Sequence, residues 1–233
     1  MTGEEALELL THGGIELLGQ LANSSNETFL IELTHDDRQH WAIYKPELGE
    51  RPLRDFPPGL YRRERGAYLL SESLGWGIVP PTVVREEAPF GIGSLQLFVE
   101  HDPTQHYFTL VAEPTIHAQL RQLALFDLVA NNADRKAGHV LQASDGRLWG
   151  IDHGLCFAAP FKLRTVLWDF AGEPVDAGLL ADVAPLADAV PDEVAEQLSW
   201  FEAEALRRRV GELLELREFP DDPTGMRFPW PLV

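Results

Sequence analysis

Three things are scarce in this sequence of 233 residues: cysteine, basic side chains and long apolar runs. The single cysteine, Cys156, excludes an intramolecular disulfide and a cluster of thiolate metal ligands, and it favours the cytoplasm. No uncharged apolar run approaches the roughly 20 residues that a membrane span needs. The opening MTGEEALELL carries glutamates where a secretory signal is basic. These absences predict a protein that is neither secreted nor embedded in a membrane.

The shortage of basic residues sets the charge. Nineteen Lys and Arg stand against 37 Asp and Glu, which gives a formal net charge of −18. A surface of this average charge repels polyanions and anionic lipid. We therefore expect no nucleic-acid partner and no stable membrane association. The total is still compatible with a local basic cleft.

The order of apolar runs predicts an α+β protein. Hydrophobic residues make up 45% of the chain, enough for one compact domain or for two small lobes that share a core. Short strand-like runs separated by turns fill the first hundred residues, and beyond residue 110 the pattern is mostly helical, best at residues 116–131 and 192–216. We expect one domain with an N-lobe at residues 1–100 and a C-lobe at residues 101–233.

One strong turn signal lies inside the helical half. Ser144-Asp145-Gly146 separates two apolar-rich runs, residues 139–143 and 147–151, and predicts a β-hairpin. Pairing these runs brings His139, before the first strand, close to Asp152, after the second. The helix at residues 116–131 ends at the same edge, in the sequence NNADR. We therefore expect Asn132, Asp134, His139 and Asp152 to converge.

This set of side chains suits metal-assisted chemistry. An acidic pair with an additional oxygen or imidazole ligand suits a divalent cation, and an uncoordinated carboxylate can accept a proton from a hydroxyl group. Asn and Asp also occupy turns simply to form hydrogen bonds with the backbone, and for any single residue this is the more common role. Their arrangement on one edge favours the chemical interpretation.

A lysine and a glutamate in the first half form a second candidate pair. In the strand-like residues 40–46, HWAIYKP, alternation puts Trp41, Ile43 and Lys45 on one face, which we expect to be buried. A lysine on a buried face needs an anionic partner. Glu64 lies at the edge of the apolar stripe of the following helix, so it is a candidate for that partner. The alternative is that water solvates both side chains.

In this order the features resemble the kinase plan, and the details resemble the atypical branch, the phosphatidylinositol 3- and 4-kinase superfamily. The segments GSLQLFVEHD (residues 93–102), FDLVANNADRKAGHVL (126–141) and GIDHGLCF (150–157) look most like type II phosphatidylinositol 4-kinases, in a small bacterial branch. The similarity covers residues 14–170. It implies a two-lobed, protein-kinase-like fold with a strand-rich N-lobe and a mainly helical C-lobe, and it implies ATP-dependent phosphotransfer.

The resemblance also implies a role for each candidate residue. Lys45 would hold the α- and β-phosphates of ATP, and Glu64 would orient it. Asp134, with Asn132 in the same loop, would position or deprotonate the acceptor hydroxyl. Asp152 and His139 would bind Mg²⁺ or Mn²⁺. The implied nucleotide contacts are the turn residues Ser24, Ser25 and Asn26 at the phosphates, and Gln96, Leu97, Phe98 and Val99 in the strand whose backbone meets adenine.

Two departures from the family pattern affect this interpretation. His139 replaces the usual metal-binding asparagine, and an imidazole favours Mn²⁺ or Zn²⁺ more than an amide carbonyl does. The turn NSSNE has no glycine, so backbone N–H groups and the serine hydroxyls would have to replace a flexible phosphate-binding loop.

The acceptor and the transferred group stay open at this point. The charge favours a soluble acceptor, either a protein or a small molecule, over a lipid. Residues 153–165, HGLCFAAPFKLRT, are expected to be a short link before helical sequence resumes, which leaves little room to bind an extended peptide. Two alternatives to a kinase are a transferase of AMP with the same fold and a pseudokinase that binds nucleotide without turnover.

Overall fold

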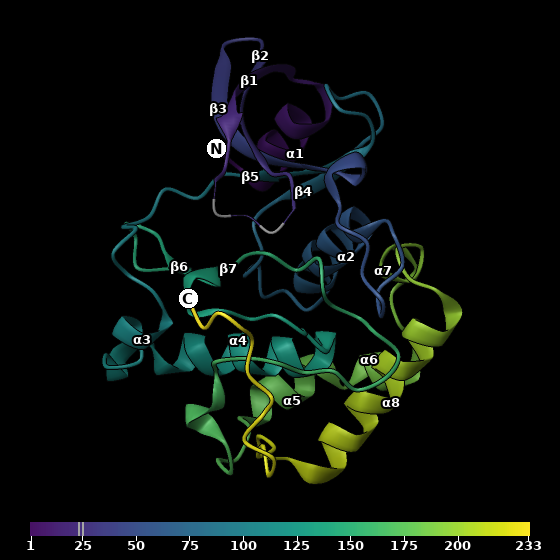
Figure 1. The fold of residues 1–233 in the computed structure, drawn as a ribbon. Coiled ribbons are helices and arrows are strands. Elements are labelled where there is room, and N and C mark those ends of the chain that lie inside the picture. Colours follow the sequence, from purple (N-terminus) through teal and green to yellow (C-terminus); the bar gives the residue numbers. More distant parts are fainter. Residues whose placement is uncertain (23, 25) are drawn as a thin grey trace.

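The computed structural model describes residues 1–22, 24 and 26–233, and Figure 1 shows its arrangement. The first part is a five-stranded antiparallel sheet with the strand order β1-β2-β3-β5-β4. Helix α1 (Gly3–His12) begins at a Thr2 capping box and lies against this sheet. The strands are β1 (Gly14–Gln20), β2 (Phe29–His35), β3 (Arg38–Pro46), β4 (Thr82–Arg85) and β5 (Gly93–Leu97).

The two faces of β3 correct one expectation. Ala42, Tyr44 and Pro46 are the buried residues of this strand, and the first two pack with Leu9 and Leu10 of α1 in the core of the sheet. Trp41 lies on the opposite face and is 44% exposed. The prediction that the face of Trp41, Ile43 and Lys45 is the buried one was therefore wrong. The alternation correctly predicted which residues share a face of β3. Which of the two faces is buried depends on where α1 packs.

The second part of the chain is mainly helical and surrounds the buried helix α4 (His117–Ala130). The expected hairpin is present as β6 (Val140–Gln142) and β7 (Leu148–Gly150), paired antiparallel. The other helices are α2 (Leu60–Ser73), α3 (Tyr107–Leu110), α5 (Ala177–Val183), α6 (Pro185–Asp188), α7 (Asp192–Ala195) and α8 (Trp200–Leu216). Short 3₁₀ turns lie at Glu47–Gly49, Pro114–Ile116, Ala137–His139 and Trp168–Phe170.

The helical pattern at residues 192–216 belongs to two helices. Ser199 ends the irregular segment after α7 and caps α8 with a reciprocal capping box to Glu202. The local hydrogen bonds of this cap compete with a continuous helix, so the chain turns between the two elements. The prediction of one helix over these residues missed this break.

The segment after Asp152 also differs from the expectation. From residue 151 to Asp176 the chain is irregular, apart from the 3₁₀ turn Trp168–Phe170. Asn131 fastens this segment through its side chain, which donates to the carbonyls of Ala158 and Pro160 and accepts from the Lys162 N–H. Residues 153–165 are therefore an ordered segment, here called the ledge, held at the end of α4, and not a short link to the next helix.

Helix α2 connects the sheet to the helical part. Besides β4 and β5 it packs on α7, and its buried Arg63 donates to the Cys156 carbonyl and to the Glu202 carboxylate. None of the described helices is long and apolar enough to cross a membrane. The proposed division at residue 100 stays a prediction.

Candidate active site

Lys45 is the centre of the site. Its Nζ donates to Glu64 Oε1 at 2.5 Å and to Asp152 Oδ1 at 2.8 Å. Burial lowers the pKa of Lys45, but the two carboxylates outweigh burial and raise this pKa above its ordinary value. The expected Lys45–Glu64 pair is thus present, and Asp152 joins it. Gly93 on the neighbouring strand lies against the Lys45 backbone, where a larger residue would not fit. A Cβ added to Gly93 would lie 2.4 Å from the Lys45 carbonyl oxygen.

Glu64 links the lysine to the loop that carries Asp152. The Glu64 side chain is 3% exposed, and its second oxygen accepts the backbone N–H of His153 at 2.9 Å. One carboxylate of α2 therefore fixes both an ammonium group of the sheet and a backbone group that adjoins Asp152. Asp152 itself has a φ of 59°, in the left-handed region that costs a non-glycine residue free energy and is frequent at functional sites.

The hairpin brings His139 and Asp152 together as expected. His139 Nε2 lies 3.3 Å from Asp152 Oδ2, on the side of the carboxylate that Lys45 does not contact. Burial lowers the pKa of His139 to about 4. Burial also raises the pKa of Asp152, but the Lys45 ammonium outweighs it and holds this pKa well below its ordinary value. At neutral pH the pair is a carboxylate beside a neutral imidazole.

This pair fits a divalent cation. His139 Nδ1 lies 3.1 Å from the Asp134 carbonyl oxygen and 3.4 Å from the Lys136 nitrogen. A proton on Nδ1 satisfies the shorter contact, and Nε2 then presents a lone pair to the Asp152 carboxylate. Two acceptors that face each other at this distance are the arrangement that a shared cation stabilises.

The protein does not complete the coordination by itself. Within residues 1–22, 24 and 26–233, no group of three or more His, Cys, Asp or Glu side chains is placed to hold a metal ion. Metal ions at phosphate-transfer sites commonly take only one or two protein ligands, with the other positions filled by phosphate oxygens and water. Asp152 and His139 would be those two ligands.

Asp134 lies beside this pair, on the loop of residues 131–136 that follows α4 and that we name the catalytic-type loop. Its Oδ2 contacts Lys136 Nζ at 3.1 Å, and its side chain is 26% exposed. Burial raises the pKa of Asp134 above its ordinary value, and Lys136 partly opposes this effect. The carboxylate is therefore a stronger base than an ordinary exposed aspartate and is still reachable from the cleft.

Asn132 lies beneath this loop rather than in the cleft. It is fully buried, its Nδ2 donates to Asp127 Oδ1 at 3.0 Å, and its Oδ1 accepts the Asp134 N–H at 3.0 Å. The side chain thus shapes the backbone that presents Asp134. A direct catalytic role for Asn132 stays a prediction.

The sequence interpretation missed the buried network that supports this loop. Asp127 and Arg135 are both fully buried, and Asp127 accepts hydrogen bonds from Arg135 Nε and Nη2, Asn132 Nδ2 and Thr165 Oγ1. Arg135 also donates to the carbonyls of His139 and Ile151, at the two ends of the hairpin. An aspartate in the apolar run ALFDLVA was the available signal, because a buried carboxylate needs a partner.

The expected nucleotide contacts lie in two separate segments, the turn between β1 and β2 and the end of β5. Ser24 Oγ pairs with Thr28 Oγ1 at 2.7 Å, and Asn26 Oδ1 accepts the Arg51 N–H at 3.0 Å. Ser25 lies outside the described residues.

At the other end, β5 includes Gln96 and Leu97 and ends before Phe98 and Val99. Gln96 Nε2 donates to Thr82 Oγ1 inside the sheet, and Phe98 N–H donates to the Trp41 carbonyl. The Val99 carbonyl accepts from His101 Nδ1 at 2.8 Å. Contacts of these residues with adenine stay predictions.

Comparison with known proteins places this geometry in a family. No family model matches the chain. Protein Rv2133c of Mycobacterium tuberculosis (strain ATCC 25618 / H37Rv) is 42% identical over an alignment of 262 positions, which spans 96% of this chain and 94% of that protein. The chain belongs to the family of Protein Rv2133c. The name Protein Rv2133c states no activity. The function is therefore inferred from the site and from more distant relatives.

A weaker similarity extends from this Rv2133c family member to plant kinases. Phosphatidylinositol 4-kinase gamma 4 of Oryza sativa subsp. japonica is 32% identical over 124 residues, which cover 46% of this chain and 22% of that protein. This match therefore covers less than half of the chain and less than a quarter of that plant kinase. The finer assignment to the type II enzymes stays a prediction.

A solved structure confirms the kinase-like fold. The Golgi casein kinase with Mn/ADP bound superposes with a TM-score of 0.54 at 14% sequence identity, and the match covers 99% of this chain and 80% of that chain. At this identity the likeness establishes the fold alone. The predicted α+β, kinase-like architecture with a strand sheet followed by helices is thus confirmed for this member of the Rv2133c family.

Proposed function

We propose that this protein is an ATP-dependent phosphotransferase that moves the γ-phosphate of ATP to a hydroxyl group of a soluble acceptor, a protein or a small molecule. The observation that supports this most is the contact of Lys45 with both Glu64 and Asp152, beside His139 and Asp134. It joins a phosphate-binding cation, a metal-binding pair and a base in one cleft of a kinase-like fold. A structural neighbour of this fold binds Mn and ADP.

The chain's residues divide the reaction among them. Lys45 neutralises the α- and β-phosphates and is held in place by Glu64. Asp152 and His139 would hold a divalent cation, which would supply positive charge to neutralise the phosphates. Asp134 accepts the acceptor's proton while the bond between the γ-phosphorus and the β–γ bridging oxygen breaks and a new bond to the acceptor oxygen forms. The products are ADP, the phosphorylated acceptor and one proton held by Asp134.

The direct test is to identify the group that is transferred. With ATP and Mn²⁺ we expect ADP to accumulate and acceptor or protein masses to rise by one phosphate group, as measured by mass spectrometry. A mass increase by AMP would replace the proposal with nucleotidyl transfer. Binding of ATP without any product in Mn²⁺ or Mg²⁺ would replace it with a pseudokinase.

The metal preference tests the role of His139 in the same assay. Because imidazole nitrogen suits Mn²⁺ better than Mg²⁺, we expect the wild-type rate to be higher with Mn²⁺. His139→Asn restores an oxygen ligand, so it shifts the ratio of Mg²⁺-supported to Mn²⁺-supported rate upward by about tenfold. His12→Asn, which changes an exposed histidine at the end of α1, is the matched control. An unchanged ratio in His139→Asn would remove His139 from the metal site.

A further inference from the structure

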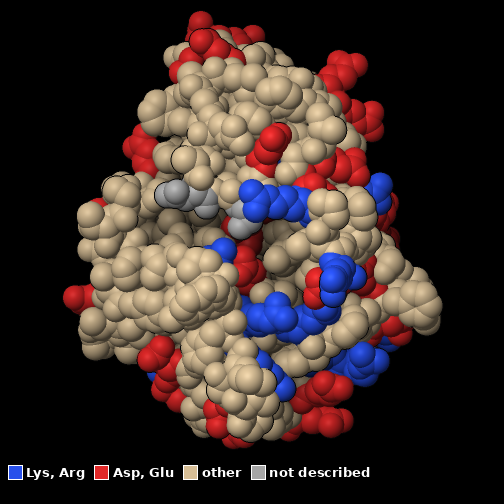
Figure 2. Space-filling model, viewed as in Figure 1, with Lys and Arg blue, Asp and Glu red and all other residues tan. Residues whose placement is uncertain are grey.

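The rim of the cleft on the acceptor side carries an excess of basic side chains. Figure 2 shows Lys and Arg around the hollow in the middle of one face, with a few Asp and Glu in and beside the hollow and the others mainly along the outer edge of this face. This is unexpected in a chain with a net charge of −18 and only 19 basic residues. Because basic residues are scarce in this chain, their concentration around the hollow indicates a function for positive charge there.

Two basic residues adjoin the proposed base, one through its side chain and one through its backbone. Lys136 Nζ contacts the Asp134 carboxylate itself. Arg164 belongs to the ledge of residues 153–165, where its N–H donates to the Asn132 carbonyl and its own carbonyl accepts the Arg135 N–H. The backbone of Arg164 is thus hydrogen-bonded to both sides of Asp134, and its side chain is exposed.

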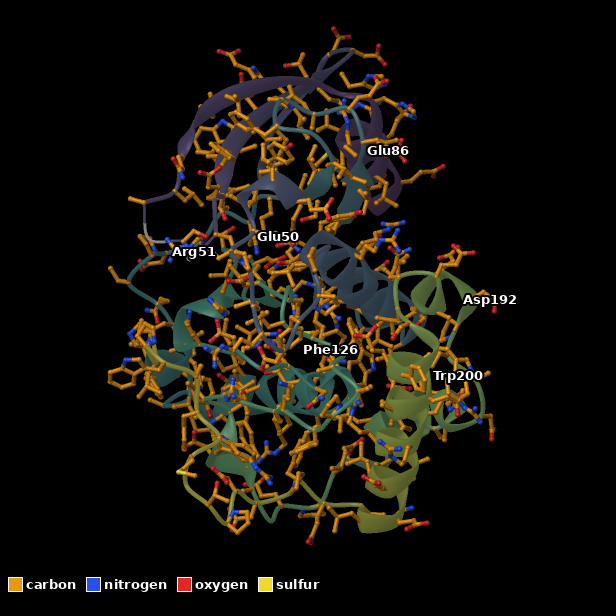
Figure 3. The ribbon with its side chains drawn as sticks, turned by 45° about the vertical axis from the view of Figure 1, so that its right-hand side comes forward. Glu50, Arg51, Glu86, Phe126, Asp192 and Trp200 are labelled. Carbon is orange, nitrogen blue, oxygen red and sulfur yellow. The ribbon has the colours of Figure 1, made fainter. Side chains whose placement is uncertain are left out.

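A loop from the sheet brings further basic residues to the same rim. The Glu50 carboxylate accepts the N–H groups of Gly59 and Tyr61 and so closes residues 50–59 into a compact loop. Figure 3 shows Glu50 and Arg51, where this loop starts, between the sheet and the helical part. Asp55 of the loop contacts Lys162 Nζ at 2.5 Å, and Phe56 packs near Ala133 of the catalytic-type loop. Arg54 is exposed beside them.

We define the basic rim as Arg54, Lys136, Lys162 and Arg164. Lys136 and Lys162 each have a carboxylate partner, Asp134 and Asp55, but none of the ion pairs among the described residues includes Arg54 or Arg164. Exposed apolar side chains interrupt the rim, with Leu53 41% and Phe161 49% exposed. Because the basic residues come from three separate segments and alternate with apolar groups, they suit an extended ligand better than a small molecule.

We propose that the acceptor is an acidic segment of a protein, bound across the basic rim with its hydroxyl at Asp134. This inference rests on the proposed function for the identity of the reacting group, and the rim itself is a separate observation. At physiological ionic strength the Debye length is about 8 Å, so the acidic remainder of the surface is largely screened while the rim is within contact distance of the ligand. Carboxylates that flank the acceptor hydroxyl then pair with Arg54 and Arg164.

Binding of a labelled peptide tests this proposal independently of catalysis. The probe is a fluorescein-labelled nonapeptide with one serine among glutamates, followed by fluorescence anisotropy at physiological salt. We expect saturable binding to the wild type, and Arg164→Glu and Arg54→Glu each weaken it by about fivefold or more, since each reverses one rim charge. Arg208→Glu, the same change at an exposed arginine of α8, leaves the affinity within about twofold.

Several results would overturn the proposal. These are no binding of the peptide to the wild type, equal weakening by Arg208→Glu, or binding of phosphatidylglycerol vesicles in place of the peptide. Stabilisation by ATP and Mn²⁺, measured on the same preparations, reports on the nucleotide site alone. If nucleotide binds and the peptide does not, the rim proposal fails; if the peptide binds and no nucleotide does, the proposed function fails.

Discussion

Asp134→Asn is expected to lower the rate of phosphoryl transfer by about 10²–10⁴-fold, because it removes the group that accepts the acceptor's proton. The substitution keeps the size of the side chain, and Lys45, Asp152 and His139 are untouched. Nucleotide affinity should therefore change little while turnover is lost. The measurement is kcat/KM for ATP consumption together with the dissociation constant of ADP and Mn²⁺.

The pH profile gives this prediction a second readout. Burial raises the pKa of Asp134 above its ordinary value. Since the ionised carboxylate is the active form, the wild-type rate rises with pH through this raised pKa and is lost below it. Asp134→Asn should lack this acid limb. The matched control is Asp36→Asn, at a 77% exposed turn residue, which should behave as the wild type. Retention of more than about a tenth of the rate, or of the limb, would exclude Asp134 as the base.

Asp127→Ala is expected to lower the free energy of unfolding by about 3–5 kcal/mol. The substitution leaves the fully buried Arg135 guanidinium without its carboxylate, and desolvating an unpaired charge is costly. It also removes acceptors for Asn132 and Thr165. Because this network holds the backbone on both sides of Asp134, we expect activity to fall as well. Chemical denaturation followed by tryptophan fluorescence gives the change.

The control for this prediction is an ion pair at the surface. Glu212 lies 3.9 Å from Arg208 on α8, and both side chains are about two-thirds exposed. Water screens such a pair, so Glu212→Ala should change stability by less than about 0.5 kcal/mol. A loss below about 1 kcal/mol for Asp127→Ala would contradict the view that the buried pair fixes the catalytic-type loop.

The parts of the site that could be predicted are those set by local periodicity and turn chemistry. A turn at Ser144-Asp145-Gly146 determines which residues face each other, so the approach of His139 to Asp152 followed directly. The strand and helix periods made Lys45 and Glu64 candidates for a pair, although the face of β3 that carries Lys45 was wrongly expected to be buried. That these two side chains do meet depends on how α2 packs beside the sheet.

The parts that could not be predicted depend on such packing. Which face of β3 is buried depends on α1, and the anchoring of residues 153–165 depends on the side chain of Asn131. The Asp127–Arg135 pair joins a helix to the loop that follows it through atoms that are fully buried. The basic rim assembles from three segments, so no stretch of sequence displays it.

The central claim is that Lys45, Glu64, His139 and Asp152 form a site for a nucleotide and a metal ion. The most direct test is the thermal shift produced by ATP with Mn²⁺, each measured against the same protein without ligand. With ligand at about 100 times its dissociation constant, the wild-type melting temperature should rise by about 5–10 °C. Asp152→Asn should lose most of that rise, and Asp145→Asn, at the exposed hairpin turn, should keep it. No rise in the wild type, or an equal rise in Asp152→Asn, would contradict the claim.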